Sequence, residues 1–465
     1  MNTILAVAAS LLVAGCATFT DDGGFRAVEV AAKERLDKEV KWIRTEGDAD
    51  SLRGVLTKLM AAPLSADDAV QIALLNNRGL QAVYAELAIA EADLVQAGRI
   101  RNPHYSLSRV SRGSESPNID EALSLEIISL LTLPLRSRME ARRFEAVKLS
   151  VSERMLKLAH DTRRAYFQAV AAEQSARYME QVRESAEAGA ELAARMASAG
   201  NFPQLTRMRE QAYFAEVSVN LARTRQAAIA QREKLTRLMG LAGDDLRFQL
   251  PERLPDIPAS LPDQSSVEEV ALRDRLDVQA AKRASEQIAA SLGLTKATRF
   301  INVLEVGRAR KKDGDQPFHY GYEISLELPL FDWGGARVAR AEALYMQSVE
   351  HVAEVAINAR SEAREAYAAY RTAYDAAKHY RDEIVPLRKR ISEETLLRYN
   401  GMLIGVFELL IDAREQVAGV NEYIQALRDF WIASGDLQTA LTVGSPGATA
   451  AIQSNSVMSG SSRGH

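Results

Sequence analysis

The chain has 465 residues, 26% of them charged, a formal net charge of -4 and one cysteine. A single cysteine excludes a disulfide framework and any metal site built from several cysteines. Lys and Arg are interleaved with Glu and Asp and form no concentrated basic face, so no nucleic-acid partner is expected.

The N-terminus reads as a targeting segment. An apolar run from Ile4 leads into LLVAGC, which ends at Cys16. This order resembles a bacterial lipoprotein signal, so we expect residues 1–15 to be a signal peptide and Cys16 to carry the lipid, including palmitate. An ordinary secretory peptide cleaved nearby is the alternative. Ala17 favours the outer membrane by the same resemblance, and the lack of Lys or Arg before Cys16 favours a start codon further upstream.

No later run reaches the roughly 18 to 20 apolar residues that a membrane helix needs. Any crossing of a membrane is therefore expected to use strands. Residues 16–63 predict an N-terminal arm, polar at first and then helical. Ser65, followed by Asp67 and Asp68, is a typical helix cap and predicts a helix that begins at residue 66.

The rest of the chain reads as two copies of one unit, joined by a proline-rich linker over 251–266. The first copy, 64–250, predicts a helix over 66–97, strands over 104–110 and 122–135, and long helices over 137–199 and 204–240. The second copy, 267–443, predicts a helix over 267–294, strands over 299–308 and 319–330, a helix reaching 399 that is kinked at Pro386, and a last helix over 406–442. The tail, 444–465, is rich in Ser, Gly and Ala and predicts disorder.

The strands predict one apolar and one polar face, because apolar residues alternate with small or charged ones. The segment 299–308 alternates poorly, so its register is not predicted. In a membrane the apolar face would meet lipid and the polar face a lumen. The predicted lipid-facing residues are Tyr105, Leu107, Leu123, Leu125, Ile127, Tyr320, Tyr322, Ile324, Leu326 and Leu328. The predicted lumen-facing residues are Ser106, Glu126, Glu323 and Glu327.

Short motifs recur in the same order in both copies. Leu-Thr-Leu-Pro-Leu at 131–135 matches Leu-Glu-Leu-Pro-Leu at 326–330, and Arg-Glu-Gln occurs at 209–211 and 414–416. Such phased repetition indicates a duplicated structural unit.

With the Leu-Ser-Ala-Asp-Asp start at 64–68, Asn102-Pro103, Leu-Pro-Leu-Phe-Asp-Trp-Gly at 328–334 and the Tyr-Asn-Gly turn at 399–401, the chain resembles the TolC family of outer-membrane efflux proteins. The resemblance implies an α+β membrane protein with a long α-helical tunnel and a 12-stranded β-barrel shared by a homotrimer, with two internal repeats per chain. It also implies an outer-membrane location in a Gram-negative bacterium, most of the chain in the periplasm, and docking on a periplasmic adaptor and an inner-membrane pump.

The turns between the paired long helices are expected to form the periplasmic tip and to contact the adaptor. These residues are Gly200, Asn201, Phe202, Pro203, Gly401, Met402 and Leu403. Just beyond the second turn, Glu408 and Asp412 lie four apart on one helical face. The resemblance implies that acidic residues near this place ring a closed aperture. The alternative for both is an exposed acid favoured by the helix dipole.

We found no catalytic motif, no cofactor-binding motif and no histidine pair with metal-ligand spacing in the sequence. The resemblance implies a passive exit duct of a tripartite efflux or type I secretion system, and with no such motif we do not expect an enzyme. A periplasmic adaptor lipoprotein with helical hairpins and a structural coiled-coil envelope protein are the alternatives. The transported substrate, whether drug, metal ion or protein, is not predicted.

Overall fold

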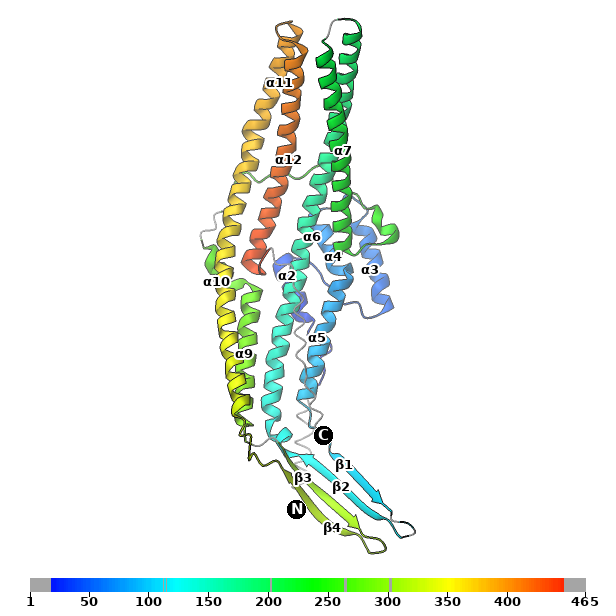
Figure 1. Cartoon of the computed structure of the whole chain (residues 1–465), viewed down its shortest axis with the longest axis vertical. Helices are drawn as coiled ribbons and strands as arrows, with labels where there is room; N and C mark the ends of the chain where they lie inside the picture. Colours follow the sequence, from blue (N-terminus) through cyan, green and yellow to red (C-terminus); the bar gives the residue numbers. More distant parts are fainter. Residues whose placement is uncertain are drawn as a thin grey trace.

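The computed structural model describes residues 18–111, 113, 115–200, 203–262, 266–300 and 303–446. The predicted signal peptide with Cys16, the tip residues Asn201 and Phe202, and the tail from 447 lie outside the described residues. The described chain is a long rod of helices with one small sheet at one end (Figure 1). Among the described helices, none is both long enough and apolar enough to cross a membrane.

The N-terminal arm contributes two short helices, α2 (Arg26–Leu36) and α3 (Glu46–Leu59). The first repeat then runs through α4 (Ala66–Asn76), α5 (Arg78–Ala97), β1 (His104–Val110), β2 (Asn118–Glu126), α6 (Ile127–Ser198) and α7 (Gln204–Met239). Ser65 caps α4 through a reciprocal pair of hydrogen bonds with Asp68, as its sequence predicts. A short 3-10 turn, η1 (Gly243–Arg247), leads into the linker.

The second repeat has the same order of elements. It comprises α8 (Val267–Asp274), α9 (Leu276–Ala297), β3 (Leu304–Lys312), β4 (His319–Leu326), α10 (Gly335–His379), α11 (Val385–Asn400) and α12 (Val406–Thr442). The α+β class and the two internal repeats are therefore confirmed. A single π-helical turn, η2 (Tyr380–Ile384), separates α10 from α11. It ends two residues before Pro386, so the irregularity expected at this proline lies in the turn that precedes it.

The four strands form one antiparallel sheet in the order β1-β2-β3-β4. Two hairpins, one from each repeat, therefore lie edge to edge, with β2 paired to β3. Gly307 allows the backbones of β3 and β2 to approach closely. A Cβ atom at position 307 would lie 2.7 Å from the carbonyl oxygen of Leu123. The two turns of the hairpins point away from the helices (Figure 1).

Three predicted strand positions are wrong. Ile127 begins α6 instead of continuing β2, because the adjacent apolar pairs that follow Glu126 break the alternation. Leu328 lies beyond β4, whose pairing ends before Pro329, a residue without an N–H to donate. The strand predicted over 299–308 instead spans Leu304–Lys312, and Lys311 and Lys312 pair with β2 instead of forming a turn.

The two helices predicted over 66–97 and 267–294 are each broken in two, and these breaks organise the rod. α7 ends against the break between α4 and α5. The side-chain amide of Asn76 donates to the carbonyls of Met239 (3.1 Å) and Gly240 (2.8 Å), and that of Asn77 donates to the carbonyl of Leu238 (2.9 Å). Gly240 has φ +68°, and a Cβ there would lie 2.8 Å from the Asn76 carbonyl oxygen, so the end-on contact requires glycine.

α12 ends in the same way against the break between α8 and α9. The Asp277 N–H donates to the Val443 carbonyl (3.2 Å), and Arg275, which is fully buried, donates to the Ala440 carbonyl (3.4 Å). Its guanidinium also pairs with Asp277 (2.6 Å) and with Glu362 of α10 (2.8 Å). The last carbonyl groups of each long return helix thus accept hydrogen bonds from the residues at the start of the shorter helix that continues toward the sheet.

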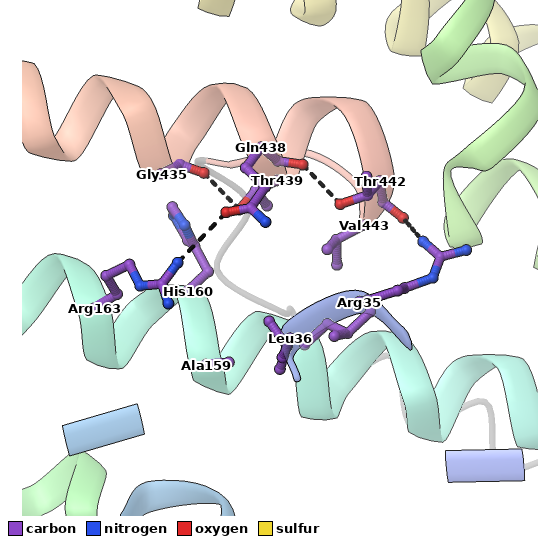
Figure 2. A pocket seen from close by; sticks show the side chains of 11 residues that line it. Arg35, Leu36, Ala159, His160, Arg163, Gly435, Gln438, Thr439, Thr442 and Val443 are labelled. Atoms are coloured by element: carbon purple, nitrogen blue, oxygen red, sulfur yellow. Dashed lines mark hydrogen bonds between the residues drawn. The ribbon is translucent and has the colours of Figure 1, made fainter. Parts of the chain in front are cut away.

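The N-terminal arm fastens the second of these junctions. Figure 2 shows Arg35 of α2 reaching the end of α12, where its Nη1 donates to the Thr442 carbonyl (2.6 Å). The cavity beneath it, lined in part by Leu36, Ala159 and His160, has a volume of about 30 Å³. That is room for about one water molecule, so this cavity is a packing feature and not a solute site.

The main core is a belt at mid-length, where α4, α8 and the linker pack on α6, α10 and α12. The linker crosses α12 and α10, where the Trp431 indole donates to the Pro255 carbonyl (2.9 Å) and the Tyr374 hydroxyl donates to the Ala259 carbonyl (2.8 Å). A second cluster joins α2 and α5 to α6, and a third lies between α6 and α7 nearer the tip.

A half-buried carboxylate lies beside the second junction. Burial, and secondarily the Asp277 carboxylate, raise the pKa of Glu153 from 4.5 to about 7, against the opposing charges of Lys157, Arg154 and Arg275. The folded protein therefore holds this proton more tightly than the unfolded chain does. The stability that the protonated Glu153 gives the folded protein is present below about pH 4.5 and is lost as pH rises toward about 7.

We therefore expect Glu153→Gln, which cannot ionise, to raise the melting temperature more at pH 8 than at pH 5. The gain at pH 8 should correspond to roughly 2 kcal/mol, less than the full shift implies because Glu153 keeps partial contact with solvent. Circular dichroism melts at the two pH values measure this, with Glu184→Gln on the exposed side of α6 as the control. An equal rise in melting temperature at both pH values would contradict the raised pKa of Glu153.

Candidate functional site at the helical tip and the sheet

The two turns between paired long helices lie together at the end of the rod opposite the sheet (Figure 1). The α11–α12 turn is strongly exposed, with Met402 93% and Leu403 77% accessible, and Met402 adopts a left-handed φ of 59°. Gly401, Gly200 and Pro203 are also exposed. This end therefore presents unpartnered apolar side chains to solvent in the single chain.

The two acidic residues predicted for an aperture have different surroundings. The exposed Glu408 caps α12, because its Oε2 accepts a hydrogen bond from the Gly405 N–H (2.9 Å). Asp412 is buried, with 7% of its surface accessible, and its Oδ2 has no hydrogen-bond partner in the described chain. Gln416, one turn further along α12, accepts a hydrogen bond from Ser392 of α11 (3.3 Å). Glu408 is thus presented at the tip, whereas Asp412 lies within the packed helices.

A charged pair near the tip joins the two helical hairpins. Arg414 of α12 donates through Nη2 to both carboxylate oxygens of Glu210 in α7, at 2.9 and 3.0 Å. Glu210 is 3% accessible, and the guanidinium lies 3.9 Å from the ring centroid of Tyr213. A desolvated carboxylate held by a guanidinium that also stacks on an aromatic ring is a strong local link. This pair is the inter-hairpin tie.

The inter-hairpin tie borders a groove of about 340 Å³ between α6, α7 and α12. Its lining includes Tyr178, Gly189, Tyr213, Leu410 and Arg414. Leu410 approaches Gly189 closely, since a Cβ there would lie 3.7 Å from Leu410 Cδ2. The hairpins are therefore only partly packed against each other near the tip, where the inter-hairpin tie adds a polar contact between α7 and α12.

Sequence reasoning missed Glu210, Tyr213 and Arg414 as functional residues. A signal was available, because Glu210 and Arg414 belong to the two copies of Arg-Glu-Gln. It also missed Leu205 and Met208, which expose 60% and 56% of their surface on the first turns of α7. From sequence alone, apolar residues in the first turns of a helix are expected to pack against a neighbour, and only the structure shows that these two are uncovered.

At the other end, the register places side chains in rows across the sheet, because paired residues of antiparallel strands point to the same face. Ile127 and Leu328 lie outside the strands. The other eight residues predicted to face lipid all lie on one face, the apolar face: Tyr105, Leu107, Leu123, Leu125, Tyr320, Tyr322, Ile324 and Leu326.

Ser106, Glu126 and Glu323 lie on the opposite, polar face. Glu327 follows β4, and its N–H donates to the Val303 carbonyl (3.2 Å), so the pairing continues for one more residue. One row of the polar face consists only of small residues, namely Ser106, Ala122, Ala309 and Gly321. Within the described chain, no group of three or more His, Cys, Asp or Glu residues could hold a metal ion.

We expect loss of the inter-hairpin tie to destabilise the tip. Arg414→Gln should lower the free energy of unfolding by about 2 kcal/mol, because it leaves the buried Glu210 carboxylate unpaired, and Glu210→Gln should lower it by less, because Arg414 keeps partial contact with solvent. The double variant should lose less than the sum of the two, with a coupling of about 1 kcal/mol or more. Urea unfolding followed by circular dichroism measures this.

The control for the tie is Glu415→Gln, which removes the exposed pair between Glu415 and Arg388. Exposed pairs contribute little, so this variant should change the free energy of unfolding by roughly 0.5 kcal/mol or less. Strict additivity of the two tie variants would show that the residues do not act as a pair.

No family model and no curated protein sequence matches the chain. Solved structures do. The outer membrane channel CmeC of Campylobacter jejuni aligns with a TM-score of 0.71 at 16% identity, over 90% of this chain and 93% of CmeC. The outer-membrane channel OprN aligns with a TM-score of 0.70 at 18% identity, over 87% of this chain and 94% of OprN.

The open state of the MtrE outer membrane channel of Neisseria gonorrhoeae also aligns. Its TM-score is 0.68 at 19% identity, over 81% of this chain and 88% of MtrE. The alignments thus cover most of this chain and most of each of the three channels. The chain has the fold of these outer-membrane channels.

Proposed function

We propose that this chain forms, as a homotrimer, the outer-membrane exit duct of a tripartite efflux or type I secretion system. The observation that carries the proposal is a fold shared over most of the chain with solved outer-membrane channels. The sheet at one end, with an apolar and a polar face, supports it physically. An adaptor with a single helical hairpin would lack the second repeat and this sheet.

The need for several copies follows from the sheet. β1 and β4 are its two edges, and each carries unpaired backbone groups along one side. Open edges are not tolerated in hydrocarbon, where no water can satisfy them. Pairing β4 of one copy with β1 of the next removes both edges, and three copies give a closed sheet of twelve strands. The apolar face would then meet lipid and the polar face would line the lumen.

In the same trimer, six helical hairpins would enclose a tunnel that narrows at the tip. The exposed Glu408 would be repeated three times around the axis, where like charges repel one another and attract cations. Asp412, buried in the single chain, would approach that aperture only if the helices separate. We propose that opening requires the inter-hairpin tie to yield, because it holds α12 to α7 immediately behind the aperture.

The partners follow from the two ends of the rod. The apolar side chains of Met402, Leu403, Leu205 and Met208 form the surface on which a periplasmic adaptor would dock, and the pump would act through it. Replacing Leu403 with a charged residue should abolish co-purification with the adaptor if this surface is used.

We further propose lipidation of Cys16, which palmitate labelling of wild-type cells and cells carrying Cys16→Ser would test.

The proposed function predicts a heat-resistant trimer with a small conductance. Unboiled protein should migrate as a trimer on a denaturing gel and collapse to the monomer on boiling, because the shared sheet opens slowly. In a planar bilayer the trimer should give a small, cation-preferring conductance, since the tip is closed. A monomer that never inserts would contradict the proposal.

The aperture makes a second prediction. Glu408→Gln keeps an oxygen that can accept the capping hydrogen bond from Gly405 but removes the charge, so block of the conductance by divalent cations should weaken roughly tenfold. The control is Glu191→Gln, at an exposed position of α6 near the tip, and it should leave the block by divalent cations unchanged. Unchanged block in the Glu408 variant would remove this residue from the aperture.

A further inference from the structure

The apolar face of the sheet is not uniformly apolar. The two rows nearest the helices contain only aliphatic side chains: Leu304 beside Leu326, and Leu125 beside Val306 and Ile324. Each of the three rows nearer the hairpin turns contains a basic residue of β3. These rows hold Arg308, Arg310 and Lys312, and Arg109 of β1 is joined to the last of them through Ile119. The four residues form a basic band at the far end of the face.

Most of the positive charge in the basic band is not neutralised by the chain itself. Glu121 is the acid on this face of the strands, and it pairs with Arg310 (2.7 Å). In the part of the chain that the structure describes, no carboxylate lies within ion-pair distance of Arg109, Arg308 or Lys312. The neighbouring Asp120 and Asp313 lie near Lys311, at 3.9 and 3.7 Å, which alternation places on the polar face.

Aromatic rings surround the basic band. Tyr105 and Tyr322 share the row of Arg308, and Tyr320 shares the row of Arg310. The guanidinium of Arg308 lies 5.6 Å from the Tyr320 ring centroid, and that of Arg310 lies 4.8 Å from the Phe318 ring centroid. Tyrosine is enriched where a protein passes from hydrocarbon to lipid headgroups, since one end of its ring is apolar and the other polar.

From this arrangement we infer that the basic band binds the phosphate groups of an anionic lipid whose acyl chains cover the aliphatic rows. The inference rests on the proposed placement of the sheet in a membrane. Successive rows on one face are about 7 Å apart, so the cations of β3 span roughly 14 Å, enough for a headgroup with two phosphates. Guanidinium groups match phosphate oxygens in pairs, and the continuous apolar rows favour a lipid over a soluble phosphate.

The test uses the purified full-length protein in neutral detergent, titrated with lipid A, which carries two phosphates, and followed by native mass spectrometry. Arg308→Gln combined with Lys312→Gln should weaken lipid A binding roughly tenfold or more, at about 1 kcal/mol for each basic residue. Lys311→Gln, on the same strand but the opposite face, is the matched control and should bind as the wild type does.

Arg308→Lys combined with Lys312→Arg keeps both charges and should retain binding, which separates charge from misfolding. Equal weakening by Lys311→Gln, no weakening by the double Gln variant, or equal competition by inorganic pyrophosphate would overturn the inference. Lipid binding is read on whatever assembly the protein forms, so it is independent of conductance. A trimer that conducts but binds lipid A identically in all variants would overturn this inference alone.

Discussion

The end-on contact between helices supports the whole rod. A helix ends with unsatisfied carbonyls, and two long return helices that end inside a protein present that problem twice. The first repeat solves it with the amides of Asn76 and Asn77, and the second with the buried guanidinium of Arg275. The chemistry differs although the geometry is repeated. α5 and α9 thus continue α7 and α12 toward the sheet, beside α6, which runs without a break from β2 to the tip turn.

Elements with a strong period were predicted well from the sequence. β1 and α12 occupy the residues expected, because alternation or helical spacing persists from end to end. The errors occur where two signals overlap. After Glu126 the run Ile-Ile-Ser-Leu-Leu suits a strand in composition but not in period, and helix wins. In β3 the basic side chains on the apolar face hide the alternation, and only pairing with β2 fixes the register.

The candidate site was harder to predict than the fold. The tip turns could be located from the helix-breaking Gly and Pro residues in them. The inter-hairpin tie, in contrast, joins residues 204 positions apart and depends on tertiary packing. Likewise, sequence spacing placed Glu408 and Asp412 on one helical face, but only the packing of the helices shows that one caps a turn and the other is buried. Spacing along one helix says nothing about which neighbour covers it.

The row of Ser106, Ala122, Ala309 and Gly321 has a consequence for transport. In the proposed trimer, three such rows would line the lumen, twelve residues in all, and none has a side chain longer than a hydroxymethyl group. Because the strands of a barrel are tilted, each row would run obliquely across the wall. Along these rows the main chain itself would form the wall, so they present neither a charge nor a bulky side chain to a passing solute, and any sieving by diameter would depend on other residues.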